Sequence, residues 1–109
     1  MSEFDGRLLI CATTFPDHPA AEAVVTQLVG AGLVVCGQIG GQMTSLYRWQ
    51  GELCRETEVA VSLKVRDDRL GEALARLRKA HPYAVPQLLC WPATHVDRDY
   101  GKWAWEEGL

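Results

Sequence analysis

The sequence predicts an α+β fold in which two helices cover one face of a four-stranded antiparallel sheet. Apolar stretches with strand and helix periodicities follow one another in the order βαββαβ. The two middle strands are consecutive, with no helix between them. Both β-α-β connections should be right-handed, which places both helices on the same side of the sheet. This is the ferredoxin-like arrangement, a βαββαβ sandwich, extended here by a long bent β-hairpin and an extra C-terminal helix.

The first strand and the first helix are predicted before residue 33. Residues 7–14 (RLLICATT) form a nearly continuous apolar run, which is typical of a strand buried in a sheet. Asp17 can cap the helix that follows, and Pro19 is tolerated in its first turn. Gly32 is the expected left-handed residue at the helix end. The predicted buried face recurs at helical spacing and consists of Ala21, Val24, Val25, Leu28 and Val29.

A long hairpin is predicted next. Residues 34–39 and 43–49 both have strand character, and residues 33–49 fully extended would span about 56 Å. A sphere holding a chain of this length is only about 34 Å across. The ribbon must therefore bend, and the pair Gly40-Gly41 is the expected place. The distal part of the hairpin should then project from the body.

The returning strand and the C-terminal half complete the pattern. Gln50-Gly51 predicts a tight hairpin turn, and residues 56–66 then alternate between apolar and polar side chains. A second helix should begin at Asp67 or Asp68 and end near His81. The remaining predicted features are a buried helix stripe of Leu70, Ala73, Leu74 and Leu77, a short strand over 87–91, and a third helix that begins at Asp97 or Asp99.

Length and composition bound the function. The 109 residues suit a single domain over 1–109, with residues 1–6 expected to be a flexible N-terminus. The formal net charge of −3 argues against a nucleic-acid partner. The apolar runs are too short to span a bilayer, and the acidic start is unlike a signal peptide, so we expect no membrane partner and a cytoplasmic location.

The four cysteines show no Cys-x-x-Cys pair, which excludes the common zinc and redox motifs. Cys11, Cys36 and Cys90 lie in apolar runs and are predicted to be small buried hydrophobic residues. Cys54 lies beside Arg55 near the hairpin turn, and we expect it to be the most exposed thiol. All four should be free in a reducing compartment.

Several short strings become distinctive when taken together. In this order and spacing they resemble the CutA family of divalent-cation tolerance proteins, over roughly residues 7–106. The strings are TTFPD at 13–17, Cys36, TSLYRWQG at 44–51, Leu63-Lys64, HPYAVP at 81–86, and Asp99-Tyr100 with Trp103.

The resemblance implies a tight homotrimer that forms by edge-to-edge sheet pairing, with the long hairpin reaching a neighbouring subunit. It also implies tolerance of copper and other divalent metals, no established enzymatic reaction, and, through a PII-like architecture, a ligand site in the clefts between subunits. The chain departs from the family pattern in two places. It has no cysteine over residues 13–15, and Gln87 stands where many members carry a glutamate.

His81 is the candidate metal ligand, with Cu2+ or another divalent ion as the metal. Imidazole suits copper and zinc, and the family resemblance assigns a copper contact to the histidine of His-Pro-Tyr. The alternative is structural, because His81 continues an apolar helix stripe and lies at a helix C-terminus. The candidates for a ligand cleft between subunits are Tyr47, Trp49, Lys64, Tyr83 and Trp103, with interface packing as the alternative for the aromatic residues.

The leading hypothesis is a homotrimeric, non-enzymatic divalent-cation tolerance protein, with copper first among the metals and no organic cofactor. The uncovered sheet face and the aromatic hairpin support self-association. The alternative hypothesis is a PII-like signalling or scaffold trimer that binds a small anionic metabolite, with Lys64 neutralising the ligand. A small enzyme ranks last, because the sequence shows no nucleophile paired with a base and no Gly-rich phosphate loop.

Overall fold

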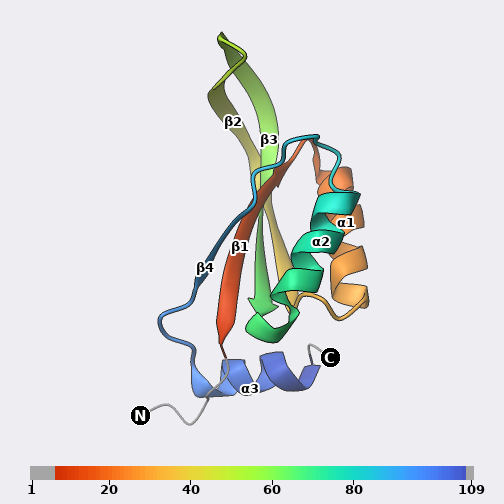
Figure 1. The fold of residues 1–109 in the computed structure, drawn as a ribbon, viewed down its shortest axis with the longest axis vertical. Helices are drawn as coiled ribbons and strands as arrows, with labels where there is room; N and C mark the ends of the chain where they lie inside the picture. Colours follow the sequence, from red (N-terminus) through yellow and green to blue (C-terminus); the bar gives the residue numbers. More distant parts are fainter. Residues whose placement is uncertain (1–6, 108–109) are drawn as a thin grey trace.

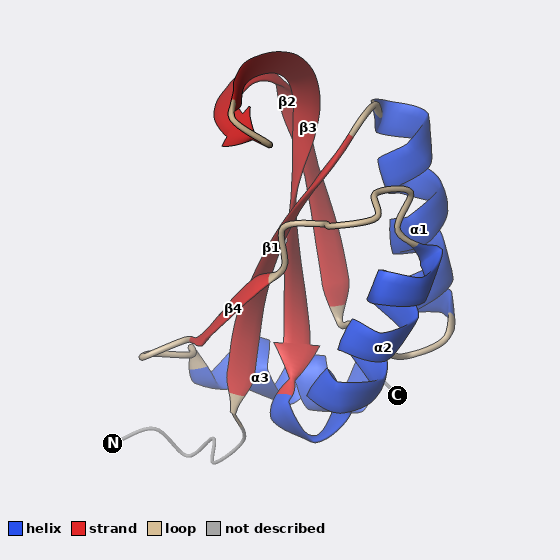
Figure 2. Cartoon of the chain, turned by 45° about the horizontal axis from the view of Figure 1, so that its top comes forward, coloured by secondary structure: helices blue, strands red, loops and turns tan. Residues whose placement is uncertain are grey.

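The computed structural model describes residues 7–107, and the sheet within it has the predicted antiparallel topology. The strand order is β2-β3-β1-β4. Helices α1 and α2 lie together over one face of this sheet, and α3 lies across one end (Figure 1, Figure 2). The N-terminal segment 1–6, expected to be flexible, lies outside the described residues. The elements are β1 (Leu8–Phe15), α1 (His18–Gly30), β2 (Cys36–Trp49), β3 (Glu52–Arg66), a 3-10 turn (Asp67–Arg69), α2 (Leu70–Ala80), β4 (Leu89–Pro92) and α3 (Arg98–Glu107).

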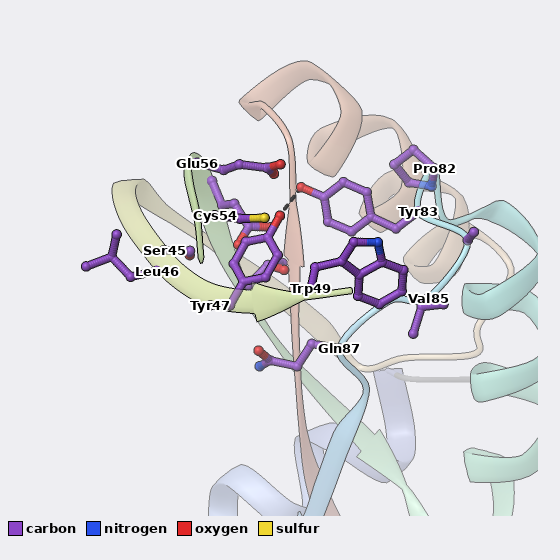
Figure 3. Close-up of a pocket in the computed structure, with 13 residues that line it drawn as sticks. Ser45, Leu46, Tyr47, Trp49, Cys54, Glu56, Pro82, Tyr83, Val85 and Gln87 are labelled. Atoms are coloured by element: carbon purple, nitrogen blue, oxygen red, sulfur yellow. Dashed lines mark hydrogen bonds between the residues drawn. The ribbon is translucent and has the colours of Figure 1, made fainter. Parts of the chain in front are cut away.

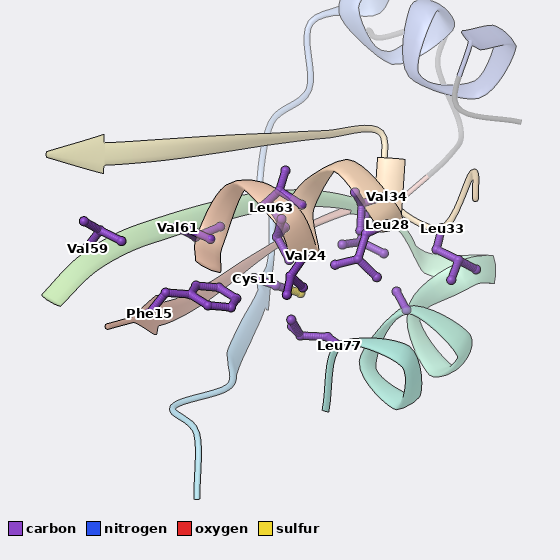
Figure 4. Close-up of a cluster of buried hydrophobic side chains, with 14 residues drawn as sticks. Cys11, Phe15, Val24, Leu28, Leu33, Val34, Val59, Val61, Leu63 and Leu77 are labelled. Atoms are coloured by element: carbon purple, nitrogen blue, oxygen red, sulfur yellow. The ribbon is translucent and has the colours of Figure 1, made fainter. Parts of the chain in front are cut away.

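The core lies between the sheet and the two helices (Figure 4). Val59, Val61, Leu63 and Val65 of β3 all face it and are buried, which confirms the alternation predicted for this part of the strand. Phe15 from β1, Leu28 from α1 and Leu77 from α2 are fully buried against them. The prediction was wrong for Val29, which is 42% exposed. Val29 lies about 80° around the helix from Ala21, at the edge of the buried stripe.

Local signals at the helix ends behave as predicted. Asp17 Oδ1 accepts a hydrogen bond of 2.8 Å from the Ala20 amide at the start of α1. Gly32 has a φ of 72°, the left-handed conformation that favours glycine. Asp97 accepts hydrogen bonds from the Asp99 and Tyr100 amides and begins α3. The second helix begins later than predicted, because residues 67–69 form a 3-10 turn first.

The hairpin of β2 and β3 bends and projects as predicted. The pairing register shifts between Ile39 and Gln42, so Gly40-Gly41 forms a bulge. Gln50 and Gly51 both have positive φ and close a two-residue turn. The distal hairpin extends beyond the helices (Figure 1), and the chain measures 50 × 27 × 24 Å. Strand β3 begins at Glu52, four residues earlier than predicted, because the two-residue turn pairs Trp49 directly with Glu52.

The helix α3 closes the end of the sheet through a second apolar cluster, which contains Leu8, Val35 and Ala104. Arg66 is buried there. Its guanidinium binds the Asp68 carboxylate at 2.6 and 2.9 Å and lies 4.9 Å from the Trp105 ring centroid. No helix within residues 7–107 is long and apolar enough to cross a membrane.

The cysteine predictions are partly wrong. All four thiols are free, and Cys11 is buried as expected. Cys36 and Cys90 are only half-buried, because they lie on the edge strands β2 and β4. Cys54 is also half-buried, so the structure does not set it apart by exposure. Burial and the neighbouring Cys90 raise the pKa of Cys11, which keeps it a thiol at neutral pH.

Gly37 gives a test of core packing. A Cβ at this position would collide with Val25 Cγ1 and lie 3.0 Å from Leu63 Cδ2, so Gly37→Ala should lower the free energy of unfolding by about 1–3 kcal/mol. Gly41→Ala is the matched control, because it lies on the same strand with no atom within 4 Å of the added Cβ. Urea unfolding at fixed protein concentration measures both. Equal stability of the two variants would contradict this packing.

Candidate functional site

A groove of about 770 Å³ lies where the projecting hairpin meets the loop after α2 (Figure 3). This volume falls in the range of small-molecule sites, about 300–1,000 Å³. The groove is lined by Thr14, Ser45, Leu46, Tyr47, Trp49, Cys54, Glu56, Glu58, Pro82, Tyr83, Ala84, Val85 and Gln87.

Strand geometry explains why the hairpin side chains meet. Successive side chains of a strand point to opposite faces, so Ser45, Tyr47 and Trp49 share one face of β2. The turn at 50–51 fixes the register that pairs Tyr47 with Cys54 and Ser45 with Glu56. Two carboxylates of β3 therefore stand beside two aromatic rings of β2.

His81 anchors the other wall of the groove. The residue is 7% exposed, and its ring stacks on Phe15 with the ring centroids 4.4 Å apart. Nε2 lies 2.9 Å from the Thr14 carbonyl oxygen and 3.1 Å from Thr13 Oγ1. The Tyr83 amide donates to Nδ1 at 3.1 Å. Because a carbonyl only accepts and an amide only donates, the ring is the neutral tautomer that carries its proton on Nε2.

This geometry bears on the predicted metal role of His81. Nδ1 has its lone pair in the bond from Tyr83, and Nε2 carries a proton. A metal ion could bind this ring only after one of these hydrogen bonds breaks. No group of three or more His, Cys, Asp or Glu residues within 7–107 could hold a metal ion. A single described chain therefore does not fit a preformed metal site, and the geometry favours a structural role for His81.

Tyr83 and Glu58 carry the hydrogen-bond chain into the groove. The Tyr83 hydroxyl donates to Glu58 Oε2 at 2.7 Å, drawn as a dashed line in Figure 3. Burial raises the pKa of Glu58, but hydrogen bonds from Ser45, Tyr83 and Thr14 outweigh it, and the pKa lies below its ordinary value. Burial and Glu58 together raise the pKa of Tyr83. Glu58 is therefore an anion at neutral pH.

Glu56 gives the groove a second negative charge. A hydrogen bond from Tyr47 to Glu56 raises the pKa of Tyr47 to about 12, so the phenol remains protonated. The lining residues of the described chain contain no lysine, arginine or histidine. The groove is thus electrically negative and partly aromatic.

Three of the five predicted cleft residues come together in this groove: Tyr47, Trp49 and Tyr83. The other two lie elsewhere in the chain. Lys64 Nζ donates to Gln38 Oε1 at 2.7 Å, and Trp103 packs against Tyr100 on α3. Their predicted role between subunits stays a prediction.

Glu56 and Glu58 were not predicted as site residues from the sequence. A signal for both was present, because a two-residue turn at Gln50-Gly51 fixes the cross-strand pairs by counting. Counted this way, Glu56 and Glu58 of β3 lie on the same face of the hairpin as Tyr47.

Comparisons with known proteins agree with this architecture. The model of the CutA1 divalent ion tolerance protein family matches residues 9–107. The chain belongs to this family. The divalent-cation tolerance protein CutA of Pyrococcus horikoshii is 36% identical over 100 residues, covering 92% of this chain and 97% of the relative. The CutA protein of Yersinia pestis is 34% identical over 95 residues, covering 87% of this chain and 80% of the relative.

Solved CutA structures share the fold. CutA1 of Ehrlichia chaffeensis superposes with a TM-score of 0.91 at 25% identity, covering 95% of this chain and 97% of that one. CutA of Synechococcus elongatus superposes with a TM-score of 0.90 at 30% identity, covering 97% of this chain and 94% of that one. The ferredoxin-like CutA fold predicted from the sequence is confirmed.

His81 predicts a pH dependence of stability. Burial lowers its pKa below 6.5, so the unfolded chain binds a proton more readily than the folded one. The stabilisation is complete above about pH 6.5 and is lost as the pH falls from there toward the folded pKa. Glu58, whose folded pKa is also lowered, adds a second loss below about pH 4.5.

Urea unfolding at fixed protein concentration over a pH series measures this effect. His81→Gln should flatten the slope between about pH 6.5 and pH 5, since the titrating ring is gone. His18→Gln, which removes an exposed imidazole and leaves the buried ring in place, is the matched control. A parent chain whose stability does not change over this range would rule out a buried neutral His81.

Proposed function

We propose that this CutA protein acts in divalent-cation tolerance, with copper first among the metals, as a cytoplasmic, non-enzymatic homotrimer. The observation that carries the proposal is the family match over residues 9–107. The relatives that support it are named for divalent-cation tolerance.

The exposed surface supports self-association. Leu53 and Leu46 on the hairpin are 77% and 66% exposed, and Leu89 and Trp91 on β4 are also exposed. β2 and β4 are the two edges of the sheet, where unpaired backbone groups favour pairing with another chain. Soluble monomers rarely leave so much apolar surface around open edges. A ring of three chains would cover Leu53 on the hairpin and both edges of the sheet.

Direct copper binding through His81 is the specific form of the metal proposal. Copper could bind a ring nitrogen only if the ring first lost its hydrogen bond to the Tyr83 amide or to the Thr14 carbonyl. Ligands contributed by more than one subunit would complete such a site. If neither hydrogen bond is lost, the protein would act in metal tolerance without binding copper through His81.

The alternative, a PII-like signalling or scaffold trimer that binds an anionic metabolite, finds less support in the groove. An anion needs cationic partners, and the lining residues supply two carboxylates instead. Lys64 is held by Gln38 and Ser62 on the sheet.

Sedimentation equilibrium tests the assembly. The parent chain should sediment at three times the 12.1 kDa of one chain at micromolar concentration. Leu53→Asp should weaken association at least about tenfold, because an ion replaces an apolar contact. Val29→Asp, an exposed change on the helix layer, should leave the trimer intact. A stable, folded single chain would contradict the proposal.

Copper titration of the reduced protein, followed by absorption spectroscopy, tests direct binding. Copper binding through His81 would show as saturable binding below millimolar copper that weakens at least about tenfold in His81→Ala, since a nitrogen ligand is lost. The control is His18→Ala, which removes an exposed imidazole and should have little effect. The absence of any saturable site below millimolar copper in the parent protein would reject direct binding.

A further inference from the structure

The groove beside the hairpin holds two negative charges that no cation in the described chain balances. Glu58 accepts a hydrogen bond of 2.7 Å from the Tyr83 hydroxyl, and Glu56 lies on the same face of the hairpin as the Tyr47 phenol. Both of these neighbouring groups are neutral hydroxyls. A hydroxyl group can stabilise a carboxylate without cancelling its charge.

Aromatic rings make up much of the remaining lining. Tyr47 and Trp49 come from β2 and Tyr83 comes from the loop after α2, and all three border the groove (Figure 3). The faces of such rings attract cations, and proteins bind quaternary ammonium groups through aromatic side chains. Leu46, Val85 and Pro82 add apolar contact area, which suits the carbon skeleton of a ligand.

The same lining does not suit a bare metal ion. The groove volume of about 770 Å³ is far larger than one ion, and ring faces are poor metal ligands. Cys54 is the only thiol among the lining residues of the described chain. Its Sγ donates a hydrogen bond of 3.9 Å to the Glu52 carbonyl oxygen, so it is already engaged within its own strand. Residues 7–107 bring no three metal-binding side chains together. An organic cation satisfies both the charge and the size of the groove.

We propose that this groove binds an alkylammonium ion, with its charge beside Glu56 and Glu58 and its carbon body against Tyr47, Trp49 and Tyr83. This site goes beyond the proposed role in metal tolerance, because it requires neither a metal ion nor His81 as a ligand. His81 acts as a positioning residue, since its Nδ1 holds the Tyr83 amide and so places the Tyr83 ring.

Isothermal titration of the full reduced chain, in its native assembly and in phosphate buffer, tests the proposal. Amine buffers are avoided because they would compete for the site. Choline is the cationic probe, 3,3-dimethylbutan-1-ol is its uncharged isostere, and succinate is an anionic probe. Choline should bind saturably at millimolar concentration or below. It should bind at least about tenfold more tightly than either of the other two probes.

Two matched variants separate the groove from the overall charge of the hairpin. Glu56→Gln should weaken choline binding at least about tenfold, and Glu56 is exposed, so the change should not disturb folding. Glu52→Gln removes the same charge from the same strand but does not line the groove. The choline affinity of Glu52→Gln should stay within about twofold of that of the parent chain.

Three outcomes would overturn the proposal. The isostere binds as tightly as choline, or Glu52→Gln loses as much affinity as Glu56→Gln, or the folded assembly binds no choline at millimolar concentration. The last result would indicate that a neighbouring copy fills the groove. None of these outcomes decides the copper titration or the sedimentation experiment, so this proposal and the proposed function can fail separately.

Discussion

The hydrogen bonds of the buried His81 ring hold the functional end of this fold together. The ring joins the end of β1, through the Thr14 carbonyl, to the loop after α2, through the Tyr83 amide. It also stacks on Phe15, which lies in the main core. From Tyr83 the chain of contacts continues to Glu58 on β3. One neutral imidazole thus couples three segments that are far apart in the sequence, and the geometry of the groove depends on it.

The second constraint is the length of the hairpin. A hairpin that is longer than the rest of a small domain leaves part of its surface uncovered. Here the uncovered surface includes the apolar residues Leu46 and Leu53. The same projection places Tyr47 and Glu56 opposite the loop after α2 and so creates the groove. The proposed self-association and the proposed ligand site would therefore both follow from the length of the hairpin. A shorter hairpin would have neither the exposed surface nor the groove wall.

Sequence reasoning recovered the parts that depend on local patterns. The helix stripes apart from Val29, the cap at Asp17, the bend at Gly40-Gly41 and the turn at Gln50-Gly51 follow from residue type and spacing. The short strand β4 was predicted two residues too early, because an edge strand of four residues carries little periodicity.

The site was harder to predict, because its interactions are long-range. The partners of the His81 ring lie 67 and 68 residues away in the sequence, so no local pattern reveals that both of its nitrogens are engaged. Lys64 was predicted from its place on the polar face of a central strand; its side chain binds Gln38 within the chain, and its role between subunits stays a prediction. Family resemblance correctly predicted the CutA fold, whereas the charge of the groove became visible only from the register of the hairpin.

The most direct test of this account is the protonation state of the His81 ring in the folded protein, measured by nitrogen-15 NMR of the side chain near neutral pH. The account predicts a single neutral tautomer, with an unprotonated Nδ1 that accepts from the Tyr83 amide and a protonated Nε2. A protonated Nδ1, or a ring that carries both protons, would be incompatible with the Tyr83 contact and would contradict the arrangement from which the groove is built.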